Sequence, residues 1–169
     1  MIVMNNEPKI KVFSAMNIFN ELLRKGVLQQ KISDRAVEFD KRWMNMSNKD
    51  LAQLIESNYK DVNVNIKFFY PRWYMPKPYA RVLNQSHKEM QLNGKMTGRS
   101  MPSLAGTIGH EWVHNFENHC AKFISSDIVI GHGDNSLSGK DNSVPVYIGR
   151  QVMHMAEGIH NELIKAKSK

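Results

Sequence analysis

Hydrophobic and polar positions follow two different periods along the chain, which predict both helices and strands. Between Ser14 and Lys25, apolar residues recur every three to four positions, as on one face of a helix. Gly26 stands directly after this pattern, where a helix end is expected. The same period returns after "SNKD", where Ser47 or Asn48 is placed to cap a second helix that ends near Asn58.

Strand patterns follow the second helix. The stretch "VNVNIKFFY", residues 62–70, alternates apolar and polar positions before a run of aromatics, which predicts a half-buried strand. The segments "YARVLN" and "EMQLNGKM" predict two shorter strands, and Asn93-Gly94 favours a turn or hairpin in the second. A loop rich in Ser, Asp, Asn and Gly over 124–146 and a last helix over 152–166 complete the chain. This order predicts an α+β fold, a single domain over 1–169 with a small mixed sheet.

The segment "SMPSLAGTIGHEWVH" predicts a further helix, beginning near Ser100 or Ser103, with Pro102 in its first turn. One face of that helix is apolar and is expected to be buried; it consists of Ala105, Ile108, Trp112 and Phe116.

The motif His-Glu-x-x-His lies within this helix and is typical of a metal-binding site. At about 100° per residue, His110 and His114 are separated by only about 40° around the axis, and Glu111 lies about 60° beyond His114. Two neutral imidazoles and a third ligand leave one zinc position open for water, and a carboxylate beside the metal accepts the proton of that water. The motif therefore predicts a Zn²⁺ site with His110 and His114 as ligands and Glu111 as the general base.

Five residues after the motif are candidates for the third ligand, namely His119, Cys120, His132, Asp134 and Glu157. A continuing helix turns His119 about 140° from His114, away from the metal, unless the helix ends by Asn118. The Cys120 thiolate suits a structural zinc site better than a catalytic one. Asp134 is also explained as a turn residue or as a partner that orients a zinc-bound histidine. The preferred ligand is His132, because its flanking glycines in "GHGD" allow a sharp backbone turn.

These residues resemble the metzincins, whose motif is HExxHxxGxxH. Glu117 and Cys120 occupy the positions of the family's glycine and last histidine, while "GHGD" resembles the end of the motif after an insertion, "NHCAKFISSDIV". The resemblance covers His110 to about Asn135 and implies a zincin-like fold, peptidase activity on a peptide or protein substrate, and zinc held by His132. Related zincins use an aspartate or a glutamate instead, for which Asp134 and Glu157 are the candidates.

The resemblance also suggests supporting roles. Metzincins place a methionine in a turn beneath the metal, for which Met153 and Met155 are candidates. Zincins bind the substrate as an added strand along the strand that precedes the active helix, here "EMQLNGKM". Tyr147 in "SVPVYIGR" is a candidate hydrogen-bond donor to the reacting carbonyl oxygen, if its strand does not already satisfy the hydroxyl.

Charge and composition leave two alternatives open. Lys and Arg number 23 against 16 Asp and Glu, a net charge of +7 that favours acidic partners such as nucleic acid, although no block of basic residues stands out. One alternative is therefore an SprT-like protease that digests proteins crosslinked to DNA. The other is a non-enzymatic basic domain with an incidental or structural metal site.

Cellular location is constrained only by what the sequence lacks. The single cysteine excludes an internal disulfide, and no apolar run approaches the roughly 20 residues that span a bilayer. The N-terminal residues also show no apolar signal segment, so we expect a cytoplasmic protein.

Overall fold

The computed structural model describes most of the chain, and the following account concerns those residues, namely 2–4, 10–40, 44, 46–72, 79–82, 89–119 and 143–167. Five α-helices and four strands are present among them. The helices are α1 (Ile10–Arg24), α2 (Val27–Ser33), α3 (Asn48–Asn58), α4 (Met101–His119) and α7 (Val144–Lys167). The strands are β1 (Ile2–Met4), β2 (Val64–Phe69), β3 (Ala80–Val82) and β4 (Glu89–Asn93), with a 3-10 turn, Gly94–Met96, after β4.

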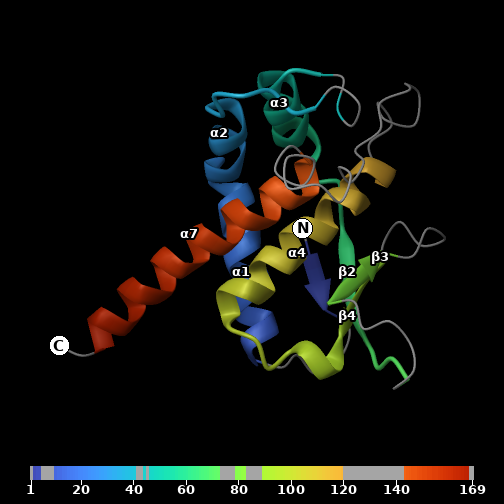
Figure 1. Cartoon of the computed structure of the whole chain (residues 1–169), viewed down its shortest axis with the longest axis vertical. Helices are drawn as coiled ribbons and strands as arrows, with labels where there is room; N and C mark the ends of the chain where they lie inside the picture. The colour runs from blue at the N-terminus through green and yellow to red at the C-terminus, as the bar shows by residue number, and fades with distance from the viewer. Residues whose placement is uncertain are drawn as a thin grey trace.

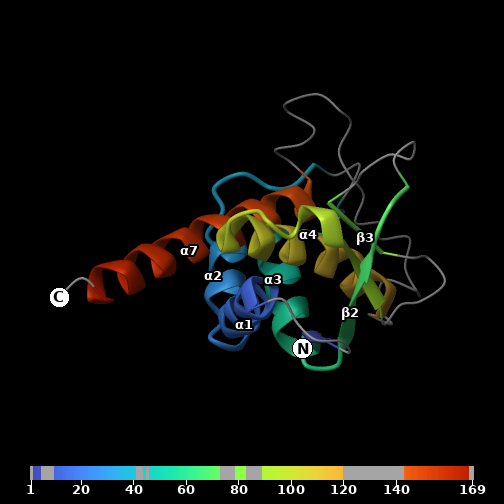
Figure 2. The same cartoon turned by 90° about the horizontal axis from the view of Figure 1, so that it is seen from below.

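The sheet is mixed, as the sequence predicts. Its strand order is β1-β2-β4-β3; β1, β2 and β4 are parallel, and β3 runs antiparallel along β4. Ile66 of β2 pairs with Met90 of β4, and both side chains are buried. The helices gather beside this sheet, and the C-terminal half of α7 extends beyond the rest of the molecule (Figures 1 and 2).

Local sequence signals place several element ends. Ser47 caps α3 by accepting a hydrogen bond from the Asp50 amide, which confirms the predicted start of that helix. Gly26 adopts a left-handed conformation, φ +68°, between α1 and α2. This conformation costs glycine little, so the chain can turn directly from one helix into the next.

Two predicted elements differ from the structure. The last helix, α7, begins at Val144, eight residues before the expected start, so Tyr147 lies on a helix rather than a strand. The predicted strand "EMQLNGKM" is shorter than expected, because β4 ends at Asn93. Asn93-Gly94 leads into the 3-10 turn, which agrees with the predicted turn, and the Asn93 side chain accepts a hydrogen bond from the Lys95 amide. None of the helices in the described part of the chain is long and apolar enough to cross a membrane.

Candidate active site

Helix α4 is held in the molecule by its apolar face. The predicted set on this face, Ala105, Ile108, Trp112 and Phe116, is completely buried. The Trp112 ring stacks on Phe116 at 5.0 Å and meets the edge of Phe19 from α1 at 5.5 Å, both between ring centroids. Large aromatic contacts of this kind fix the rotation of a helix about its axis. They therefore also fix where the motif residues on the rest of α4 point.

A second helix, α7, passes very close to α4 in the opposite direction, as Figure 1 shows. The crossing is made by two glycines. A Cβ on Gly149 would lie 2.9 Å from the Gly106 carbonyl oxygen and 3.2 Å from the Cβ of His110. Only a residue without a side chain fits at that distance. The glycine pair therefore allows the backbone of α7 to approach His110 closely.

Replacing Gly149 by alanine should therefore push the two helices apart. Although alanine favours helix by about 1 kcal/mol over glycine, overpacking here should destabilise the fold by about 1–3 kcal/mol net. The matched control is Gly158→Ala on the same helix, where an added Cβ meets nothing within 4 Å. Denaturant unfolding should show Gly158→Ala at or above the wild-type stability. An equally stable Gly149→Ala protein would contradict the tight crossing.

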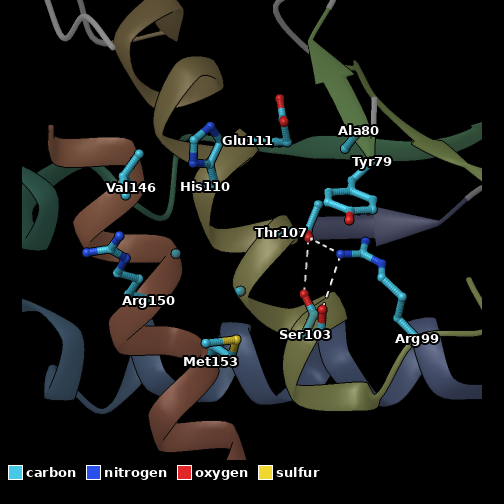
Figure 3. A pocket seen from close by; sticks show the side chains of 12 residues that line it. Tyr79, Ala80, Arg99, Ser103, Thr107, His110, Glu111, Val146, Arg150 and Met153 are labelled. Carbon is cyan, nitrogen blue, oxygen red and sulfur yellow. Dashed lines mark hydrogen bonds between the residues drawn. The ribbon is translucent and has the colours of Figure 1, made fainter. Parts of the chain in front are cut away.

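A cavity of about 350 Å³ opens between α4, α7 and the start of β3. His110 and Glu111 line it together with Thr107 one turn earlier on α4, and Tyr79 and Ala80 close the side towards the sheet (Figure 3). His114 lies one turn further along α4 and is not among the lining residues. Two of the three motif residues thus face one cavity.

The carboxyl group of Glu111 is strongly affected by its surroundings. Burial raises its pKa from 4.5 to about 7, because the charged form loses contact with water. A carboxyl group with a pKa near neutrality is suited to accept and return a proton at physiological pH. The position and the protonation behaviour of Glu111 therefore both fit the role that the sequence predicts.

The two motif histidines are close enough to share one metal ion. Their ring centroids are 5.4 Å apart and the ring planes are inclined at 69°. Zinc bound at about 2.0–2.1 Å from one nitrogen of each ring would lie roughly 3 Å from both ring centres, so this separation fits a single ion. The Nε2 atom of His114 is shielded from solvent. The donor set fits zinc as far as these two residues define it.

No family model, curated protein or solved structure matches this chain. The functional assignment therefore rests on the side chains themselves. In the described ranges, which omit 120–142, no cluster of three or more His, Cys, Asp or Glu side chains is placed to hold a metal. The preferred third ligand, His132, lies outside the described residues, as do Cys120 and Asp134.

Two other candidates for the third ligand do not fit the observed backbone. Helix α4 continues through Asn118 to His119, so the position of His119 is about 140° around the axis from His114. Glu157 is exposed and pairs with His154 at 3.5 Å. It lies eight residues beyond Gly149, about 12 Å along α7 and in the direction away from His114. We therefore exclude Glu157 as a ligand and find no support for His119.

Two supporting roles predicted from the sequence are wrong. Tyr147 donates its hydroxyl to the Lys31 carbonyl at 3.0 Å, outside the cavity, so that hydroxyl is already engaged elsewhere. Met153 and Met155 both lie within α7 rather than in a turn, inside the range that the sequence already predicts to be helical. Met153 instead packs on Gly106 at the helix crossing.

The strand predicted to bind the substrate, β4, lies inside the described sheet. β4 lies between β2 and β3, so its hydrogen-bonding groups are taken on both sides. β3 is the outer strand on this side of the described sheet, and Ala80 at its start lines the cavity. Of the described strands, β3 is therefore the one with an outer edge beside the cavity, to which an added peptide strand can pair.

Sequence reasoning missed three residues of the cavity. Arg99, Tyr79 and Arg150 line it but carry no motif spacing relative to His110 and Glu111. Tyr79 reaches the cavity from the position just before β3, and Arg150 reaches it from α7, so only the packing of these elements reveals them. Glycines within the predicted α4 were an available signal for the close helix crossing, since a glycine inside a helix often has a packing reason.

Proposed function

We propose that this protein is a zinc-dependent peptidase with a zincin-like fold. The observation that carries the proposal is the placement of His110 and His114 within reach of one metal ion, with the half-buried carboxyl group of Glu111 between them in sequence and facing a cavity. The mixed sheet, with its antiparallel outer strand beside the motif helix, is compatible with such a fold. His132 remains the proposed third ligand.

Each residue has a defined task in this proposal. His110 and His114 hold the ion, which supplies Lewis acidity that polarises the scissile carbonyl and makes water a better nucleophile. Glu111 accepts the proton of the attacking water and returns it to the leaving amine. The outer edge of β3 binds the peptide as an added strand, which lays the scissile bond along the cavity.

Zinc binding tests the proposal directly. The wild-type protein should bind one zinc ion, and His110→Ala should weaken binding at least about a hundredfold, because losing a group that merely supports a zinc ligand already costs about 10- to 100-fold. His154→Ala is the matched control, since His154 is exposed on α7 and pairs with Glu157. Competition with a chelating dye measures both affinities.

Hydrolysis of an unstructured protein substrate completes the test. Activity should disappear on removal of the metal and return with one equivalent of zinc. If His110→Ala retains wild-type zinc affinity, or if the zinc-loaded wild type cleaves no peptide bond, the proposed function is wrong.

A further inference from the structure

Among the described residues, basic side chains outnumber acidic ones in the lining of the cavity beside Glu111. Its lining includes two arginines, Arg99 from the segment before α4 and Arg150 from α7. Among the described residues, Glu111 is the one carboxyl group in the same lining. A bound zinc ion would add further positive charge. The electrostatic potential of the cavity therefore favours an anionic ligand.

Arg99 is held in a defined position. Its Nη1 donates hydrogen bonds to Ser103 Oγ at 3.2 Å and to Thr107 Oγ1 at 3.0 Å, and its guanidinium lies 4.1 Å from the centre of the Tyr79 ring (Figure 3). These three partners orient the guanidinium towards the surface of α4. A guanidinium with a fixed plane matches the two oxygens of a carboxylate.

Burial makes a carboxylate partner favourable for Arg99. The side chain is half-buried, and the loss of water lowers its pKa. A lowered arginine pKa means that the charged guanidinium is less well solvated in the protein than in water. A carboxylate that enters the cavity replaces part of that lost solvation with a charge-assisted hydrogen bond.

The distance to the motif relates Arg99 to the scissile bond. Thr107, which accepts a hydrogen bond from Arg99, lies one helical turn before Glu111, about 6 Å along the axis. An extended peptide advances about 3.3 Å per residue. A side chain that reaches Arg99 therefore belongs to a residue within about two positions of the bond that Glu111 serves.

We propose that the cavity is a subsite for an acidic side chain of the substrate, with Arg99 as the residue that selects it and Arg150 as a second positive group. This inference rests on the proposed peptidase function and specifies its substrate class. The enzyme then prefers peptides with Asp or Glu within about two residues of the cleaved bond.

The test uses short peptides of Ala and Leu that carry Glu, Gln or Lys at each position in turn. Zinc-loaded wild-type protein should show a kcat/KM about tenfold to a hundredfold higher for the best Glu peptide than for its Gln counterpart, the range expected for a hydrogen bond to a charged group. In Arg99→Gln this ratio should fall to near one, and Arg99→Glu should favour the Lys peptide. Arg24→Gln, an exposed arginine paired with Glu21, should keep the wild-type ratio.

Three outcomes would overturn the subsite. Equal rates on Glu and Gln peptides would do so while leaving the peptidase function intact. Amidated peptides test whether the rate depends on a free C-terminal carboxylate. If it does, and the Glu side chain has no effect, the cavity binds the end of the chain instead. An Arg99→Gln protein that folds, binds zinc and keeps the Glu preference would remove Arg99 from the subsite.

Binding provides a readout that does not need hydrolysis. With the metal removed, labelled Glu peptide should bind the wild-type protein at least about tenfold more tightly than Gln peptide, and Arg99→Gln should abolish the difference. Equal dissociation constants would overturn the subsite even if the protein cleaves nothing. Absence of cleavage together with the expected binding difference would instead reject the peptidase proposal alone.

Discussion

Glu111→Gln should reduce kcat for peptide hydrolysis by about a thousandfold while leaving zinc affinity unchanged. General base catalysis by a positioned side chain contributes about 10²- to 10⁴-fold, and a neutral amide of the same size cannot accept the proton of water. Glu111 lines the cavity, and burial raises its pKa to about 7, so the substitution changes the chemistry with little change in volume. Steady-state kinetics and metal analysis on the same preparation measure both quantities.

The control for this variant is Glu157→Gln. Glu157 is an exposed glutamate on α7 that pairs with His154, and it lies away from the histidines of α4. The same chemical change there should leave kcat and zinc affinity at wild-type values. Loss of zinc in Glu157→Gln would contradict its exclusion as a ligand, and a fully active Glu111→Gln would contradict the mechanism.

The second large effect concerns the stability of the metal-free protein. The pKa of Glu111 is raised from 4.5 to about 7 in the folded state by burial. A raised carboxyl pKa means that the folded state holds the proton more tightly than the unfolded chain. The resulting stabilisation is complete below about pH 4.5 and is lost as the pH rises through about 7. Between about pH 5 and pH 8 this group alone should lower the free energy of unfolding by about 2–3 kcal/mol.

Denaturant unfolding with excess chelator, at several pH values, measures this effect. Glu111→Gln removes the titrating group, so the difference between wild type and variant isolates Glu111 from the other ionisable residues. The variant should be more stable than the wild type at pH 8 by about 2–3 kcal/mol, and the two should converge towards acid pH. If the free energies of unfolding of wild type and variant change with pH in parallel, burial does not raise the pKa of Glu111.

Most of the helices and strands follow from short-range patterns. The period of apolar residues predicted α1, α3 and α4, and the alternation from Val62 to Tyr70 predicted β2, because these patterns reflect which face of an element is buried. Two elements were not predicted. β1 has three residues and α2 has seven, so each is too short for a periodic pattern to stand out.

The error at α7 shows what short-range patterns miss. Val144 to Arg150 carries a proline and a glycine, which together suggest a strand or loop. The structure makes this segment helical because Pro145 lies in the first turn, where its missing amide hydrogen does no harm, and Gly149 packs on α4. The start of α7 is thus decided by tertiary contact.

The motif histidines and Glu111 were determined by the sequence alone, because spacings of one and four residues on a helix place side chains in space without reference to the rest of the chain. What surrounds them was decided by the tertiary structure. The position of β3 at the sheet edge, the glycine crossing with α7 and the arginines of the cavity join residues that are far apart in sequence. No local period records such contacts, since they arise only when separate elements bury their apolar faces against one another.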